Sequence, residues 1–229
     1  MSVPGKPRST DKTNCVWVLA SGPAADIDIA LRYADPADVV IAADGGTLLA
    51  DRLGITPSLI IGDLDSTPSD LVTKYSAAGV EVRRYDHNTK WETDTELALL
   101  AALYYSPGRI FVLGAIGGRL DHSLANVLLL THPSFADRDV HILDGSNELF
   151  LAKPGEWNSI KGHPNDIVSL LPIGVEAEAV TTRGLRWPLN GETLVAGKAR
   201  GVSNRISDPE AAAVRYDAGQ LLVALVHET

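Results

Sequence analysis

The sequence predicts an α/β N-terminal domain, with a mainly parallel sheet flanked by helices, followed by an all-β C-terminal sandwich domain. Two observations predict this division. Over the first 150 residues, short apolar runs typical of strands alternate with stretches of helical spacing, which indicates crossover units and parallel pairing. Beyond about residue 153 the helical spacing disappears, and short β-like runs are separated by Pro, Gly and Asn, which favours antiparallel strands.

The α/β domain is expected to span residues 14–152, after a polar tail formed by residues 1–13. Apolar runs predict its strands at 16–20, 38–43, 59–61, 81–85, 110–113 and 140–143. Apolar residues at helical spacing predict the helices between them at 27–33, 47–53, 70–78, 93–105 and 124–130. The helix at 93–105 has the clearest start, because Thr93 and Glu96 have the spacing of a capping box.

The β-domain is expected to span residues 153–229. Its apolar runs predict strands at 167–171, 193–195, 211–216 and 221–226. These runs are short and lie between turn residues, as in small antiparallel domains.

Composition excludes several classes of protein. A chain of 229 residues with 45% hydrophobic residues can bury a proper core. The net charge of -9 argues against a nucleic-acid surface, because there is no basic excess to displace counterions. No apolar run reaches the roughly 18 residues that a membrane helix needs, and the N-terminus lacks a signal-peptide core, so a cytoplasmic location is expected. The single cysteine, Cys15, cannot form a disulfide within the chain and is expected to be a small buried strand residue.

Acidic residues follow several of the predicted strands. Asp44 follows the second strand, Asp63 and Asp65 follow the third, and Asp121 lies in the segment after the fifth. Asp94 opens the helix that comes after the fourth strand. Because the carboxyl ends of parallel strands meet at one edge, which is where open α/β sheets bind ligands, we expect these carboxylates to converge. Carboxylates beside glycines at such an edge suggest a site for magnesium and a nucleotide.

The simpler interpretation of each acid alone is a turn residue or a helix cap. Asp63 and Asp65 argue against it, because they are one residue apart where a single cap would suffice. With Asp94 they could hold Mg²⁺, while Lys90 and Arg119 could neutralise phosphate oxygens. Both cations have a solvated surface position as their alternative. The chain lacks a Walker A pattern and a Rossmann glycine fingerprint.

Taken in order, these motifs resemble the thiamine pyrophosphokinase (thiamine diphosphokinase) family. Each matching segment is short, but the ordered set is specific and covers the chain from about residue 38 to its C-terminus. The matching segments are residues 43–46, 62–66, 93–99, 117–126, 143–145, 180–185, 188–189 and 200–204.

The resemblance implies transfer of diphosphate from ATP, as co-substrate, to the hydroxyl of thiamine, giving AMP and thiamine diphosphate. It implies dependence on Mg²⁺ and a homodimer with its sites at the subunit interface. It assigns Asp63, Asp65 and Asp94 to the metal. It places near the nucleotide and the transferred group Asp44, Gly45, Gly46, Lys90, Thr93, Gly118, Arg119, Asp121 and His122, of which Arg119 and Asp121, with Asp94, are expected to be catalytic. Ser203 and Asn204 match the pair that lines the thiamine site.

Several alternatives stay open at this point. Either Asp94 or Asp121 could accept the hydroxyl proton. His122 could serve only a local hydrogen bond. The family usually has an acid where this chain has Trp91, and we expect Trp91 to pack against or cover the site. Loss of turnover would leave a thiamine- or nucleotide-binding regulatory protein, and a different acceptor would make the chain a pyrophosphokinase for another alcohol.

Overall fold

The computed structural model describes residues 13–23, 26–135 and 137–228, so nearly all of the predicted tail of residues 1–13 lies outside the described residues. Contacts divide the chain into two compact units: residues 1–129 with 138–145, and residues 130–137 with 146–229. The strand formed by residues 147–152 falls in the second unit, whereas the sequence placed the boundary after residue 152. Within the described part of the chain, the helices are too short or too polar for any of them to cross a membrane.

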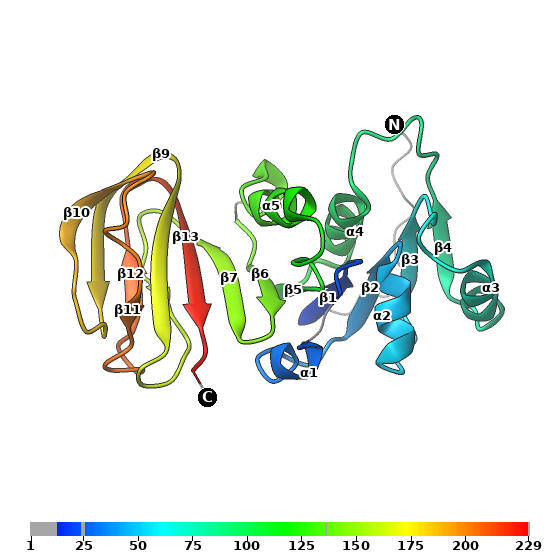
Figure 1. The fold of residues 1–229 in the computed structure, drawn as a ribbon, viewed down its shortest axis with the longest axis horizontal. Coiled ribbons are helices and arrows are strands. Elements are labelled where there is room, and N and C mark those ends of the chain that lie inside the picture. The colour runs from blue at the N-terminus through cyan, green and yellow to red at the C-terminus, as the bar shows by residue number, and fades with distance from the viewer. Residues whose placement is uncertain (1–12, 24–25, 136, 229) are drawn as a thin grey trace. The chain divides into compact units, whose positions relative to one another are not determined.

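The first unit contains the predicted parallel sheet (Figure 1). Its strands are β1 (Cys15–Leu19), β2 (Val39–Ala43), β3 (Leu59–Gly62), β4 (Glu81–Arg84), β5 (Arg109–Leu113) and β6 (Val140–Asp144). They lie in the order β4-β3-β2-β1-β5-β6, and every neighbouring pair is parallel. The order reverses at β1, so a crevice is expected between the segments that follow β1 and β5. Cys15 is buried in β1, as predicted.

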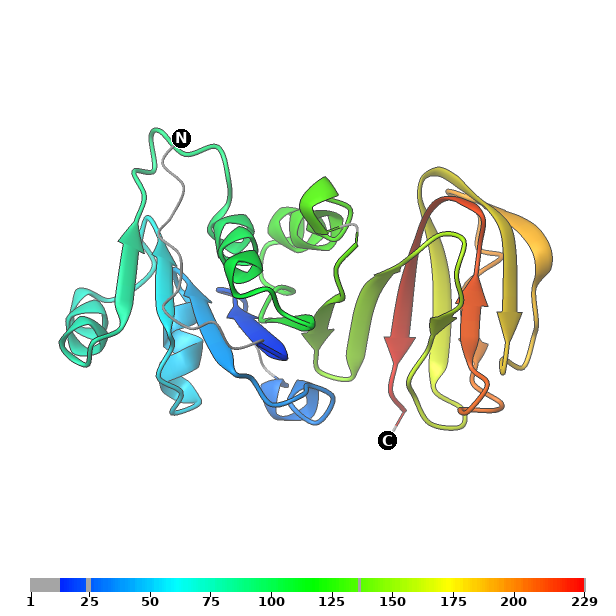
Figure 2. The same cartoon turned by 180° about the vertical axis from the view of Figure 1, so that it is seen from behind.

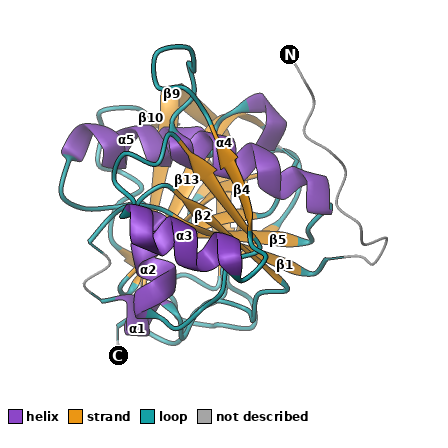
Figure 3. Cartoon of the chain, turned by 90° about the vertical axis from the view of Figure 1, so that its right-hand side faces the viewer, coloured by secondary structure: helices purple, strands orange, loops and turns teal. Residues whose placement is uncertain are grey.

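Helices cover both faces of this sheet (Figure 3). They are α1 (Ile27–Ala30), α2 (Gly46–Arg52), α3 (Ser69–Ala77), α4 (Asp94–Ala102) with the 3₁₀ turn η1 (Leu103–Tyr105), and α5 (Leu120–Leu129). Figures 1 and 3 show α4 and α5 on one face and α1, α2 and α3 on the other. One apolar core lies under α1 and α2, and a second lies under α3, around Ile60 and Tyr75.

Two predicted helices have different limits in the structure. The first is shorter than predicted and ends at Ala30. The last begins at Leu120 rather than at residue 124, because its polar first turn hides the apolar pattern. An acidic residue in that turn, Asp121, suits a helix N-terminus, where the macrodipole is positive.

The second unit is antiparallel (Figure 2). It comprises η2 (Pro133–Phe135) and the strands β7 (Asn147–Ala152), β8 (Asn158–Ser159), β9 (Ile167–Arg183), β10 (Asn190–Val195), β11 (Asn204–Arg205), β12 (Ala213–Arg215) and β13 (Ala218–Val226). The four strands predicted here are present, and β7, β8 and β11 are additional. The packing of these strands as a sandwich stays a prediction.

The long strand β9 pairs with four other strands of this unit, namely β10, β11, β12 and β13. The sequence predicted only its first five residues. Pro172, Gly174 and Ala179 interrupt the pattern: Gly174 and Ala179 have positive φ, and the pairings with β10 and β13 shift register along this stretch. A strand that bends through irregularities of this kind carries no continuous alternation of apolar residues.

Candidate active site

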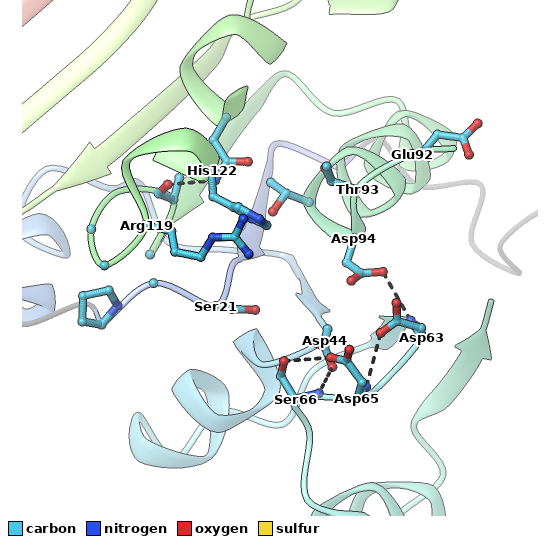
Figure 4. A pocket seen from close by; sticks show the side chains of 18 of the residues that line it. Ser21, Asp44, Asp63, Asp65, Ser66, Glu92, Thr93, Asp94, Arg119 and His122 are labelled. Atoms are coloured by element: carbon cyan, nitrogen blue, oxygen red, sulfur yellow. Dashed lines mark hydrogen bonds between the residues drawn. The ribbon is translucent and has the colours of Figure 1, made fainter. Parts of the chain in front are cut away.

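A cavity of about 680 Å³ lies at the carboxyl edge of the parallel sheet in the first unit (Figure 4). The segments after β1, β2, β3 and β5 line it, together with residues on the loop before α4 and on the first turns of α4 and α5. This is the crevice expected where the strand order reverses. Of the predicted site residues, the cavity brings together Asp44, Asp63, Asp65, Lys90, Thr93, Asp94, Gly118, Arg119 and His122.

The carboxylate of Asp44 is buried at the end of β2, with only 4% of the residue exposed. Its Oδ1 accepts hydrogen bonds from the Ser66 backbone N–H at 3.2 Å and from the Thr67 hydroxyl at 3.1 Å. Asp44 also has a φ of 42°, a left-handed conformation that is rare outside glycine. The bonds to the β3–α3 loop therefore hold Asp44 in a strained position, as is common at functional sites.

The loop after β3 comes very close to the start of α4. The Asp63 backbone N–H donates to Asp94 Oδ1 at 3.3 Å. A Cβ on Gly62, whose φ is 145°, would lie 2.8 Å from that same oxygen, so only glycine fits here without a shift. Leu64, in the same loop, is buried with a φ of 62°, a strained left-handed conformation. The glycine and this strained residue explain how the end of β3 and the start of α4 can bring their acids together.

Lys90 joins these acids instead of lying in solvent. Its side chain is only 9% exposed, and its Nζ is 2.7 Å from Asp63 Oδ2 and 2.5 Å from Asp94 Oδ1. The hydrogen bond from Lys90 lowers the pKa of Asp63 to about 2 despite partial burial. The pKa of Asp94 is raised instead, because its burial and the nearby charges of Asp63 and Asp44 outweigh the contact with Lys90. The two shifts differ in direction mainly because Asp94 is more deeply buried, and the neighbouring carboxylates add to that effect.

Asp44, Asp63 and Asp94, called the acidic triad below, offer carboxylate oxygens that all lie within 4.8 Å of one another. A second group with the same spacing consists of Asp63, Asp65 and His87. Hard oxygen donors converging on a cavity fit Mg²⁺, which is usually held by one or two carboxylates with water and phosphate oxygens. Asp63 and Asp94, two of the three predicted ligands, thus lie in one group, with Asp44 as the third member.

Arg119 and Asp121 lie at the start of α5. Arg119 lines the cavity, and Figure 4 shows it across the open space from the acidic triad. Its Nε donates to Asp121 Oδ1 at 3.1 Å, and the two side chains are 70% and 65% exposed. The bond from Arg119 lowers the pKa of Asp121 to about 2. Asp121 is not among the residues that line the cavity.

Gly45 and Gly46 also lie outside the cavity lining. A Cβ on Gly46 would lie only 1.9 Å from the Leu19 carbonyl oxygen, so this glycine lets α2 pack directly against β1. Thr93 lines the cavity and also caps α4, since its hydroxyl oxygen accepts the Glu96 N–H at 3.2 Å. The predicted helix start is confirmed.

Ser203 and Asn204 line a separate pocket of about 220 Å³ in the second unit. Asn204 is buried, and its amide is engaged with the backbone of Trp187: Nδ2 donates to the carbonyl at 2.6 Å, and Oδ1 accepts the N–H at 3.1 Å. Trp187 is half exposed and lines the same pocket. Asn204 therefore holds an exposed aromatic ring at the edge of a small pocket.

Two family models match the chain. "Thiamin pyrophosphokinase, catalytic domain" matches residues 30–142, and "Thiamin pyrophosphokinase, vitamin B1 binding domain" matches residues 158–221. This chain belongs to the thiamine pyrophosphokinase family.

Individual members of that family agree with the match. The thiamine pyrophosphokinase of Bacillus subtilis (strain 168) is 29% identical over 189 residues, which is 82% of this chain and 88% of the relative. The crystal structure of thiamine pyrophosphokinase from Bacillus subtilis superposes with a TM-score of 0.82 at 25% identity, covering 94% of this chain and all of the other. The thiamin pyrophosphokinase structure from Geobacillus thermodenitrificans gives 0.78 at 26% identity, covering 94% and 98%.

Several residues that line the cavity of this thiamine pyrophosphokinase family member were not predicted from the sequence. Ser21, Gly22 and Pro23 line the cavity directly after β1, and their place at the sheet edge was a usable signal. Asn126 on α5 ends the matching segment 117–126 but was not predicted as a site residue, whereas His87, whose Nδ1 is 2.9 Å from Asp63 Oδ2, carries no such signal. Their positions depend on how the loop before α4 and the helix α5 fold over the site.

Trp91 is 96% exposed, so the expectation that it packs against the site is wrong, while its role in covering the site stays a prediction. Its neighbours Lys90 and Glu92 line the cavity. This segment lies between the turn at residues 87–89 and the start of α4, and Trp91 within it faces solvent.

Proposed function

We propose that this protein transfers a diphosphate group from ATP to the hydroxyl of thiamine, releasing AMP, in a reaction that requires Mg²⁺. The observation that carries the proposal is the acidic triad, three carboxylates from three separate segments that face one cavity at the sheet edge. Its residues lie within the match to the family's catalytic domain. Like charges are gathered this closely at a cost that a bound cation offsets.

Asp63 and Asp94, with Asp44 or Asp65, are proposed to hold Mg²⁺, which when bound would neutralise charge on the phosphate oxygens. Lys90 already neutralises part of the triad from within the cavity. Among the described residues, the exposed guanidinium of Arg119 bonds only to Asp121, in a surface pair of small energy, so it can turn towards a phosphate at little cost. Phosphoryl transfer depends mainly on this kind of positioning and charge neutralisation.

For the proton of the attacking hydroxyl, Asp94 is the better of the two candidates. It lines the cavity, and its pKa is raised by burial and by the neighbouring carboxylates. Asp121 lies outside the lining, and its bond from Arg119 gives it a low pKa of about 2, which makes it a weak base.

We propose that the pocket with Ser203, Asn204 and Trp187 takes thiamine. Two observations support this. The pocket lies within the match to the vitamin B1 binding domain. The half-exposed Trp187 ring, which already has the Arg186 guanidinium 5.1 Å from its centre, is also of the type that binds a cation such as the thiazolium.

The reaction is tested by incubating the protein with Mg²⁺, ATP and thiamine and separating the products by chromatography. We expect AMP and thiamine diphosphate in equal amounts. ADP with thiamine monophosphate would instead make the protein an ordinary kinase. The same assay run with other alcohols, guided by thermal shifts with thiamine analogues, identifies the preferred acceptor.

One observation favours a binding protein without turnover as the second candidate. Trp91 stands where the family usually has an acid, and its side chain contributes no carboxylate to the cavity. Thiamine binding without any AMP formation would support this alternative. The complete acidic triad favours the enzyme.

We further propose a homodimer in which each site takes acids from one subunit and the thiamine pocket from its partner. Leu120, Leu124 and Leu128 form an exposed apolar stripe on α5, at 73%, 56% and 51% exposure, which is a surface that a second subunit could cover. Apolar side chains spaced four apart lie on one side of a helix.

Subunit exchange tests the shared site. Asp94→Asn and Asn204→Ala are each expected to be nearly inactive. Since about half of the exchanged dimers are mixed and each has one intact site, exchange should restore roughly a quarter of wild-type activity. If each subunit built its own site, every site would carry one lesion, and verified exchange would restore nothing.

A further inference from the structure

The second unit contains a group of potential metal ligands that the proposed reaction does not use. The nitrogens of His163 and His227 and a carboxylate oxygen of Asp166 all lie within 4.8 Å of one another. We propose that these three residues bind a transition-metal ion of the zinc type, with Glu148 holding the ring of His227 in place.

Strand register brings three of the four residues together. Leu225 of β13 pairs with Glu148 of β7 on one side and with Val168 of β9 on the other. His227 and Asp166 each lie two residues beyond such a core position, and alternate residues of a strand share a face. Val168 and Leu225 are completely buried in the core of this unit. His227 and Asp166 therefore continue the buried face of the two strands beyond Leu225 and Val168. This explains why they are only 5% and 0% exposed.

A tight turn adds the fourth residue, His163. The Asp166 N–H donates to the His163 carbonyl at 3.1 Å, with Pro164 and Asn165 at the two central positions. Asn165 has a φ of 76°, as the third residue of a type II turn requires. The preceding Gly162 allows the close approach, because a Cβ there would lie 2.8 Å from Asp166 Oδ2. This turn sets His163 directly beside the buried carboxylate.

The distances suit a tetrahedral ion. Asp166 Oδ2 is 3.1 Å from His227 Nδ1 and 3.8 Å from His163 Nδ1. Bonds of about 2.0–2.2 Å to a tetrahedral zinc ion put neighbouring ligand atoms roughly 3.3–3.5 Å apart. The side chain of His163 is 77% exposed, so its ring can rotate to close the remaining gap. Water would supply the fourth ligand, since this side of the group faces solvent through His163.

The surroundings of the group also match a metal centre. His227 Nε2, on the far side of the ring from the proposed ion, is 3.3 Å from Glu148 Oε2. The other oxygen of Asp166, Oδ1, accepts the Glu228 N–H at 2.9 Å. Metal-bound histidines commonly donate their second N–H to a carboxylate, and metal-bound carboxylates are in turn hydrogen-bonded. Both features are therefore already in place.

The charge of the group formed by Asp166, His227 and Glu148 also favours a divalent ion. Asp166 Oδ2 lies 3.1 Å from His227 Nδ1 and Glu148 Oε2 lies 3.3 Å from its Nε2, so this largely buried group contains two carboxylates. A divalent ion that displaces the proton from Nδ1 brings this group to neutrality, which a largely buried site favours. The nearby Glu228 carboxylate has its own partner in Arg205, at 2.6 Å.

The donor set also distinguishes this site from the acidic cavity. Two imidazole nitrogens with one carboxylate favour zinc, cobalt or nickel, whereas Mg²⁺ prefers oxygen ligands alone. A bound ion would tie the residue that follows β13 to the turn that precedes β9. Because the unfolded chain does not hold these residues together, metal binding would stabilise the fold.

The test uses the full chain, stripped with a chelator and titrated with Zn²⁺ or Co²⁺ at neutral pH in excess Mg²⁺. We expect one tightly bound ion per chain, a visible Co²⁺ absorption band typical of tetrahedral coordination, and a higher melting temperature with Zn²⁺. His163→Ala should lower Zn²⁺ affinity at least about tenfold, and Glu148→Gln about 10–100-fold. Because His163 is largely exposed, His163→Ala should melt like the wild type when metal is absent.

His87→Ala is the matched control. His87 is similarly exposed, at 73%, and belongs to the acid-and-imidazole group with Asp63 and Asp65. This variant should keep the zinc site. Loss of zinc in His87→Ala with retention in His163→Ala would place the ion in the cavity and overturn the proposal. Absence of tight binding to the wild type, or equal binding by the wild type and His163→Ala, would overturn it as well.

Discussion

The two ends of the parallel sheet carry the same kinds of residue in different arrangements. At the carboxyl ends, the acidic triad gathers three carboxylates within 4.8 Å around a cavity. At the amino ends, Arg109 separates the acids: its Nη1 is 3.1 Å from Asp35 Oδ2, and its Nε is 2.6 Å from Asp139 Oδ2. Interleaved charges hold strand ends together, whereas clustered like charges prepare a place for a cation.

The pKa values of Asp94 at the carboxyl ends and Asp139 at the amino ends shift in opposite directions, as these two arrangements of charge would predict. Burial opposes the charge of both Asp94 and Asp139. For Asp139, hydrogen bonds from His141 and Arg109 outweigh burial and lower its pKa to about 2. For Asp94, the neighbouring carboxylates reinforce the effect of burial, and its pKa is raised. A partly buried aspartate thus indicates structure or function according to the charges around it.

The largest expected effect is on turnover, which should fall when acids at the carboxyl ends of the strands are changed but not when an acid at the amino ends is changed. Asp63→Asn and Asp94→Asn should each lower turnover on the order of 10²-fold or more, because charge placement supplies most of the catalysis. Asp139→Asn should leave turnover unchanged. Initial rates at limiting Mg²⁺, with circular dichroism to verify folding, measure the contrast. Near-normal rates in both cavity variants would show that the acidic triad is not catalytic.

A lysine pair tests whether cavity charge or surface charge matters. Lys90→Gln leaves the crowded acids without their buried cation, so turnover should fall about tenfold and the free energy of unfolding by about 1–3 kcal/mol. Lys74→Gln is the control, since Lys74 contacts Asp51 in an exposed pair. This variant should leave both stability and turnover nearly unchanged. Equal effects in rate assays and thermal melts would remove any special role for Lys90.

Substitutions at two glycines with positive φ allow the effect of backbone strain to be measured apart from the effect of steric crowding. Gly62→Ala places a methyl group 2.8 Å from Asp94 Oδ1, whereas Gly79→Ala meets no atom within 4 Å. Both variants should lose about 1 kcal/mol from strained φ. Only Gly62→Ala should also lower turnover, by several fold, because it displaces Asp94. Unchanged kcat in Gly62→Ala would indicate that the loop adjusts without moving the acid.

The smallest effect concerns pH at the amino ends. The folded pKa of Asp139, about 2, lies below its ordinary value of 3.8, so its carboxylate stabilises the fold above that value. This contribution is lost as the pH falls from about 4 towards 2. Since the side chain is 39% exposed, we expect only about 0.5–1 kcal/mol at neutral pH. Urea titrations of the wild type and Asp139→Asn should converge in acid, and a pH-independent difference would contradict the assignment.

The sequence by itself determined the alternation of strands and helices in the first unit, because periodic burial is a local property of the chain. It also predicted that Asp44, Asp63 and Asp94 would meet, since the carboxyl ends of parallel strands must share an edge. It missed most of β9, whose Pro172 and Gly174 interrupt the alternation while pairing with other strands continues.

The tertiary structure decided the features that depend on how loops, helices and strands pack together. It placed Lys90 between two acids, brought His87 to Asp63, and left Asp121 outside the cavity. It also joined Asp166 to His227, 61 residues away, through the register of β9 and β13. Sequence spacing carries no record of such contacts, because packing and strand register fix them only when the whole unit has folded.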